Sequence, residues 1–80
     1  MYYDMSASYF GRNPEPIGKT LKEAKAYMDN VDCHCAAIQN GGIVQTICDG
    51  NGNKICQRDH NVVGIGYSRT IEISDWYDVE

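Results

Sequence analysis

The sequence predicts an α+β domain in which one helix packs on a four- or five-stranded antiparallel sheet, in the order β-α-β-β-β-β. Three observations predict this fold: a helix start signal at residues 20–23, short runs in which apolar and polar residues alternate, and Asn-Gly and Asp-Gly pairs between those runs. Eighty residues provide enough chain for one hydrophobic core. We therefore expect residues 1–80 to form a single compact domain.

The first strand is predicted near the N-terminus. Apolar and polar residues alternate from Tyr3 to Tyr9, which is the period of a half-buried strand. Residues 11–16 contain Pro14 and Pro16 and are predicted to form a loop.

The helix is predicted over residues 20–30. Thr20 and Glu23 have the spacing of a capping box, in which the threonine hydroxyl accepts from the Glu23 N–H and the glutamate reaches back to the Thr20 N–H. Asn30 is a typical helix end. The apolar residues at helical spacing are Leu21, Ala24 and Met28.

Three short strands are predicted after the helix, at residues 33–39, 43–48 and 54–58. Two turns separate them: Asn-Gly-Gly at 40–42 and Asp-Gly-Asn-Gly-Asn at 49–53. Asn-Gly and Asp-Gly between β-rich runs are strong hairpin signals.

A long last strand is predicted over residues 63–73. Gly64 and Gly66 lie on its other parity, where a helix packs closely or a bulge forms. The apolar residues of one parity are Val63, Ile65, Tyr67, Ile71 and Ile73.

Charge is distributed unevenly along a chain whose net charge is −4. Residues 1–60 carry seven acidic and six basic side chains, whereas residues 61–80 carry four acidic ones and Arg69. Overall acidity argues against direct binding of nucleic acid, which depends on neutralising phosphates. No apolar run has the length of a membrane helix or a signal peptide, so we expect a cytoplasmic protein with reduced cysteines and no membrane partner.

The four cysteines have more than one interpretation. If residues 41–42 form a two-residue turn, Cys35 faces Cys48, and if residues 50–54 form a loop, Cys48 faces Cys56. Such a line of thiols is compatible with a reduced core, with a disulfide, or with a metal site completed by a histidine. The residues concerned are Cys33, Cys35, Cys48 and Cys56, with His34 or His60 as the fourth metal ligand.

Motifs for catalysis or cofactor binding are incomplete. Asp49, Asn51 and Asn53 match the first ligands of an EF-hand loop, but the sixth position is Lys54 rather than glycine, so a hairpin turn is expected. Gly-Lys-Thr at residues 18–20 lacks the first glycine of a phosphate-binding loop. We therefore expect no enzyme, no catalytic residue, no metal and no cofactor.

The C-terminal segment is the predicted contact surface for a partner. It combines carboxylates with aromatic rings, which either anchor interfaces or pack back onto the core. The candidate partner-binding residues are Glu72, Asp75, Trp76, Tyr77, Asp78 and Glu80.

The order of elements over residues 1–58 resembles small phage-encoded anti-CRISPR proteins that inhibit type I CRISPR surveillance complexes. This resemblance implies a protein without catalytic residues that occupies a surface of the complex, often where DNA would enter. The residues that carry the resemblance are Thr20, Leu21, Ala24, Lys25, Cys33, Asn40, Gly41, Asp49, Gly50 and Lys54.

The sequence therefore predicts a non-enzymatic protein-binding inhibitor, specifically a viral anti-defence protein that binds a host nucleoprotein complex such as a CRISPR effector. Two alternatives remain open at this stage. One is a small metal-binding or redox protein that uses the cysteines. The other is a homo-oligomeric structural component, for example a homodimer.

Overall fold

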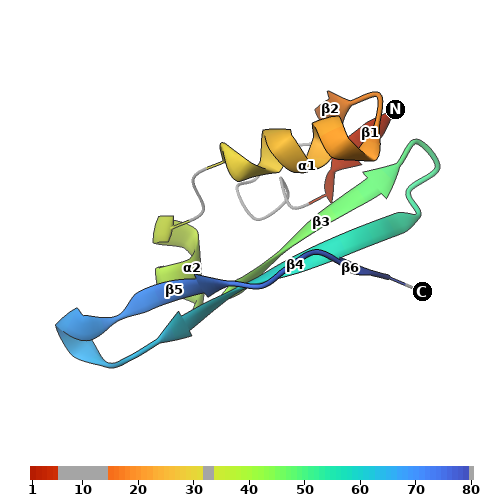
Figure 1. Ribbon diagram of the computed structural model, residues 1–80. Helices are drawn as coiled ribbons and strands as arrows, with labels where there is room; N and C mark the ends of the chain where they lie inside the picture. Colours follow the sequence, from red (N-terminus) through yellow and green to blue (C-terminus); the bar gives the residue numbers. More distant parts are fainter. Residues whose placement is uncertain (6–14, 32–33, 80) are drawn as a thin grey trace.

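The computed structural model describes residues 1–5, 15–31 and 34–79 and shows an α+β fold with two helices and a six-stranded antiparallel sheet (Figure 1). The strands follow the order β2-β1-β3-β4-β5, and β6 also pairs with β4. The elements are β1 (Tyr2–Asp4), β2 (Glu15–Gly18), α1 (Leu21–Asp29), α2 (His34–Asn40), β3 (Ile43–Asp49), β4 (Lys54–Val63), β5 (Thr70–Ile73) and β6 (Tyr77–Asp78).

Helix α1 confirms the predicted helix. The Thr20 hydroxyl accepts from the Glu23 N–H at 3.1 Å, as expected for an N-cap. The Glu23 carboxylate, however, accepts from the backbone N–H of Lys19 at 2.9 Å, one residue earlier than predicted. Asn30 caps the other end of the helix.

Helix α2 replaces a predicted strand, so the interpretation of residues 33–39 was wrong. Ala36 and Ala37 favour a helix, and the Gly42 N–H donates to the Ala37 carbonyl at 2.8 Å. Gly41, with a φ of 72°, takes the left-handed position that ends many helices. The glycines at 41 and 42 therefore terminate a helix instead of closing a hairpin.

The N-terminal part also differs from the prediction. The first strand, β1, covers Tyr2–Asp4, and residues 6–9 of the predicted strand lie outside the described residues. Part of the predicted proline loop is a strand, since Glu15–Gly18 pairs with β1 at the edge of the sheet. An edge strand tolerates Pro16 because one side of it needs no ladder hydrogen bond.

The predicted strand over residues 63–73 is a hairpin. Strand β4 continues to Val63, and the chain then turns back into β5. Gly64 and Gly66 have φ values of 91° and 58°, which glycine adopts readily and other residues rarely do. The two glycines therefore make the turn.

The core lies between α1 and the sheet. Met28 of α1 and Ile47 of β3 are almost fully buried, and Trp76 packs against the same cluster. A smaller cluster under α2 contains Ala37 and Ile43. The buried residues of the main cluster are Ile17, Ala24, Met28, Ile47 and Cys56.

Within the described residues, neither helix has the length and apolar character that a membrane crossing requires.

Candidate protein-binding surface at the C-terminal edge

The predicted contact residues follow one edge of the sheet, along β5, the link 74–76 and β6. Glu72, Asp75 and Asp78 are all exposed there. Glu80 lies outside the described residues.

This edge is anchored to β4 along its length. The Ser74 N–H donates to the Asp59 carbonyl at 2.9 Å, and the Ser74 hydroxyl accepts from the Asp59 N–H at 2.9 Å. Further on, the Val79 N–H donates to the Ile55 carbonyl at 3.2 Å. These hydrogen bonds hold the backbone that carries the edge carboxylates in place against β4.

The edge carboxylates are not neutralised by neighbouring side chains. Glu72, Asp75 and Asp78 make no ion pair with another residue in the described part of the chain. Glu72 lies on β5, Asp78 on β6 and Asp75 on the link between them, so the three carboxylates are distributed along the edge. The result is a line of free negative charge along β5 and β6, which we call the acidic edge.

Trp76 packs onto the body of the protein instead of standing free. Its ring lies over the Arg58 guanidinium, 4.6 Å from the guanidinium carbon to the ring centre, and it contacts the main core cluster. This arrangement is the inward packing that the sequence left open for the aromatic residues. Trp76 is therefore a structural anchor of the edge.

Tyr77 is exposed but has a partner within the chain. Its hydroxyl donates to the Asp59 carboxylate at 2.7 Å, and this hydrogen bond raises the pKa of Tyr77. The bond holds the ring of Tyr77 against β4.

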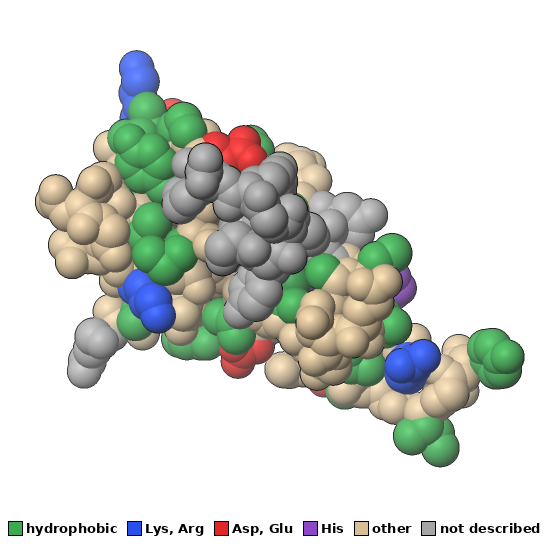
Figure 2. Space-filling view, turned by 180° about the vertical axis from the view of Figure 1, so that it is seen from behind, with side chains coloured by type: hydrophobic (Ala, Val, Ile, Leu, Met, Phe, Trp, Pro, Cys, Tyr) green, Lys and Arg blue, Asp and Glu red, His purple; other side chains and the backbone are tan. Residues whose placement is uncertain are grey.

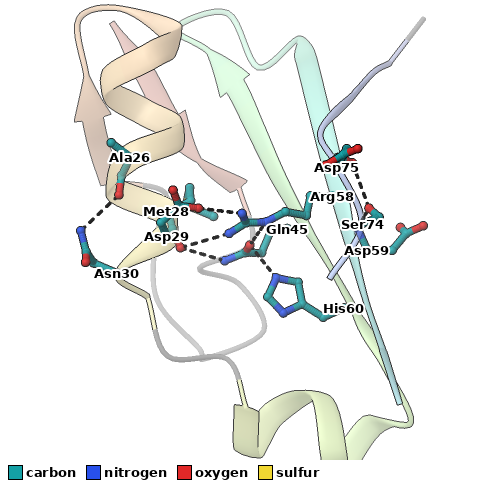
Figure 3. A network of polar contacts seen from close by, with 10 residues as sticks. All are labelled: Ala26, Met28, Asp29, Asn30, Gln45, Arg58, Asp59, His60, Ser74 and Asp75. Atoms are coloured by element: carbon teal, nitrogen blue, oxygen red, sulfur yellow. Dashed lines mark hydrogen bonds and ion pairs between the residues drawn. The ribbon is translucent and has the colours of Figure 1, made fainter. Parts of the chain in front are cut away.

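A polar network that was not predicted lies between α1 and strands β3 and β4 (Figure 3). Arg58 donates to the Asp29 carboxylate at 2.7 Å, to the Gln45 side-chain oxygen at 2.9 Å and to the Met28 carbonyl at 3.4 Å. A cation at the C-terminal end of α1 also interacts favourably with the helix dipole. Because its guanidinium is occupied by these contacts, Arg58 joins α1 to the sheet.

His60 extends this network. Its Nε2 lies 2.7 Å from the same Gln45 oxygen, and the Gln45 amide nitrogen donates to the Met28 carbonyl at 3.4 Å. In this orientation the Gln45 side-chain oxygen faces His60 and can only accept a hydrogen bond. His60 therefore carries a proton on Nε2 and donates it to this oxygen. Burial, and next the charge of Arg58, lower the pKa of His60. In the sequence, the spacing of Arg58 and His60, two residues apart on β4, is the only local signal of this network.

The cysteines do not form the predicted line. Cys35 lies on α2, and Cys56 faces Ile47 because the register shifts between Ile47 and Cys48. In the described ranges the structure contains no cluster of three or more metal-ligating residues, and Cys35, Cys48 and Cys56 are free thiols. Burial raises the pKa of Cys48 and of Cys56, which makes both thiols less reactive. Cys33 lies outside the described residues.

The Asp49 segment forms the expected turn. The Asp49 carboxylate accepts from the backbone N–H groups of Asn51 and Asn53, both at 2.9 Å. These bonds, that of Asn53 first, lower the pKa of Asp49. The carboxylate thus closes a loop between β3 and β4.

One exposed feature was missed entirely. At the turn between β4 and β5, Ile65 is 85% exposed and Tyr67 is fully exposed. The glycines at 64 and 66 were the available signal, because two glycines one residue apart between strand-forming runs are typical of a turn.

In comparisons with known proteins, no family model, no curated protein and no solved structure matches this chain. The function of the chain is therefore inferred from the chemistry of its surface.

Proposed function

We propose that this chain is a non-enzymatic, protein-binding inhibitor that uses its acidic edge to occupy a basic surface of a nucleoprotein complex. The observation that carries the proposal is the set of exposed carboxylates along β5, the link 74–76 and β6, which make no ion pair within the described part of the chain. Surfaces that bind nucleic acid present lysine and arginine to phosphates. An acidic edge competes for the same side chains.

The rigid attachment of the edge supports binding. Hydrogen bonds from Ser74 and Val79 to β4, and the stacking of Trp76 on Arg58, fix the backbone that carries the carboxylates. A preorganised surface loses less conformational entropy when it binds. Long-range attraction between opposite charges also raises the rate of association.

The specific form of the proposal is a viral anti-defence protein that acts inside the host cell, with a CRISPR effector as the partner. It is supported by the resemblance described for residues 1–58 and by the acidic edge. One element of that resemblance, the cysteine-containing strand, is helix α2 in the structure. The charge of the edge is therefore the stronger of the two supports.

The test is recovery of the partner followed by competition. Tagged protein is incubated with lysate of the natural host, and bound proteins are identified by mass spectrometry. We expect a nucleic-acid-binding complex, and we expect duplex DNA to release the tagged protein from it. Recovery of such a complex without any competition by DNA would contradict the proposed mode of inhibition.

A further inference from the structure

The hairpin of β4 and β5 extends beyond the rest of the sheet. The pairing of β3 with β4 ends at Ile43 and His60, so residues 61–63 pair with β5 and with no other described strand. This two-stranded segment and its turn, residues 61–72, form the arm. Figure 1 shows the arm at one end of the molecule, which is 40 Å long.

The tip of the arm presents two large apolar side chains, Ile65 and Tyr67, on an ordered turn. The Ser68 N–H donates to the Ile65 carbonyl at 3.1 Å, and Arg69 Nε donates to the Gly66 carbonyl at 3.1 Å. Figure 2 shows hydrophobic side chains at the narrow end of the molecule with a basic side chain beside them. Burial of one such side chain is favourable by about 1.5–3 kcal/mol, so a contact that covers the tip would be stabilised by the hydrophobic effect.

The opposite end of the molecule carries an open cavity of about 390 Å³ beside β1 and the β3–β4 turn. Tyr3 and Cys48 contribute to its lining, and Asp49 lies at the same site. Gly50 leaves the Tyr3 ring uncovered, since a Cβ at position 50 would lie 3.7 Å from that ring. The lining residues are Tyr3, Met5, Cys48, Asp49, Gly50 and Gly52.

We propose that the tip of one copy docks into this cavity of a second copy. The volume of the cavity lies within the range of about 300–1,000 Å³ that is typical of small-molecule pockets, and the tip offers an aromatic ring to it. The two surfaces also carry opposite charges, because Arg69 lies beside the tip and Asp49 lies at the cavity. The turn hydrogen bonds of Asp49 lower its pKa and so favour its charged form.

This contact joins two different surfaces and is therefore heterologous. With the tip and the cavity at opposite ends, each added copy leaves one free tip and one free cavity, so the association produces open chains. A single turn that enters one cavity involves few side chains, and interfaces below about 1,200 Å² are weak. The chains therefore form only at high protein concentration. This inference uses surfaces that the proposed function does not use.

Sedimentation velocity over a series of protein concentrations tests the inference. We expect the wild type to form larger species as concentration rises. Tyr67→Ser removes the ring from the tip. Gly50→Leu places a branched side chain against the Tyr3 ring of the cavity, at a position whose φ suits other residues. Each variant should raise the apparent dissociation constant by about tenfold or more. Tyr27→Ser, a change at a partly exposed tyrosine of α1, is the matched control and should associate like the wild type.

A mixture of the two variants provides the decisive result. Tyr67→Ser retains the cavity and Gly50→Leu retains the tip, so the mixture should form one-to-one dimers and nothing larger. A wild type that stays monomeric at every concentration would overturn the inference. Association that persists in Tyr67→Ser would overturn it as well.

Discussion

The body of this protein, which consists of the described residues outside the arm, uses the same residue types as the arm in a different way. In the body, Ile47 is fully buried and Arg58 is held by three acceptors. In the arm, Ile65 is 85% exposed and Arg69 contacts the carbonyl of its own turn. The body therefore derives its stability from these side chains, whereas the arm presents them to the surroundings. The difference separates residues that maintain the fold from residues that are available for contact.

The largest expected difference between the body and the arm is the effect of replacing an isoleucine on the free energy of unfolding. Ile47→Ala should lower the free energy of unfolding by about 2–5 kcal/mol, because it leaves a cavity under α1. Ile65→Ala should change it by less than about 0.5 kcal/mol, since that side chain already contacts solvent. Urea denaturation of both variants measures the difference. Similar losses in the two variants would show that the arm belongs to the cooperative core.

The arginines provide the next contrast. Arg58→Ala should lower the free energy of unfolding by about 2 kcal/mol, because it removes charged hydrogen bonds between α1 and the sheet. The figure is modest because Asp29 is 62% exposed and its attraction to Arg58 is screened by water. Arg69→Ala, the matched change in the arm, should cost less than about 0.5 kcal/mol. The same denaturation experiment checks both values, and an Arg58→Ala variant as stable as the wild type would refute the role of the network.

The smallest expected effect is a pH dependence of the free energy of unfolding, which is due to His60 in the body. His60 has a lowered pKa in the folded state, whereas the unfolded chain titrates near pH 6.5. Between the folded pKa and pH 6.5, the unfolded state therefore binds more protons than the folded state. His60 contributes fully to stability above about pH 6.5, and this contribution is lost as the pH falls through the folded pKa.

The measurement is urea denaturation of the wild type and of His60→Asn between pH 7.5 and pH 5. We expect the stability difference between the two proteins to shrink or reverse as the pH falls. Because His34 is present in both proteins, the comparison isolates the contribution of His60. A difference that does not change with pH would contradict the assigned state of His60.

Local signals predicted the parts of the fold that depend on neighbouring residues. Thr20 and Glu23 located the start of α1, and Asp49 located the turn between β3 and β4. The α+β character and the antiparallel sheet follow from these elements, and both were predicted.

The errors arose where one local pattern is compatible with two structures. Asn-Gly-Gly at 40–42 ends helices as well as closing hairpins, and the alanines of α2 decided the outcome. The alternating residues on both sides of Gly64 belong to two paired strands, which share the period of one long strand.

For the candidate site, the structure places Glu72, Asp75 and Asp78 at exposed positions, and their role in binding a partner stays a prediction. The inward packing of Trp76 depends on Arg58, eighteen positions away, and on the register of β6 with β4. Such contacts are set by tertiary structure and have no signature in the local sequence.

The most direct test of the central claim is the affinity of the acidic edge for the partner that the host lysate yields. Asp75→Asn combined with Asp78→Asn removes two edge charges, and Ala26→Lys combined with Gln39→Lys changes the net charge equally at exposed positions of α1 and α2. Isothermal titration should show about tenfold weaker binding for the first variant, since each lost charge contact costs about 0.5–1 kcal/mol, and unchanged binding for the second. Equal affinities for both variants would contradict the claim that the edge is the contact surface.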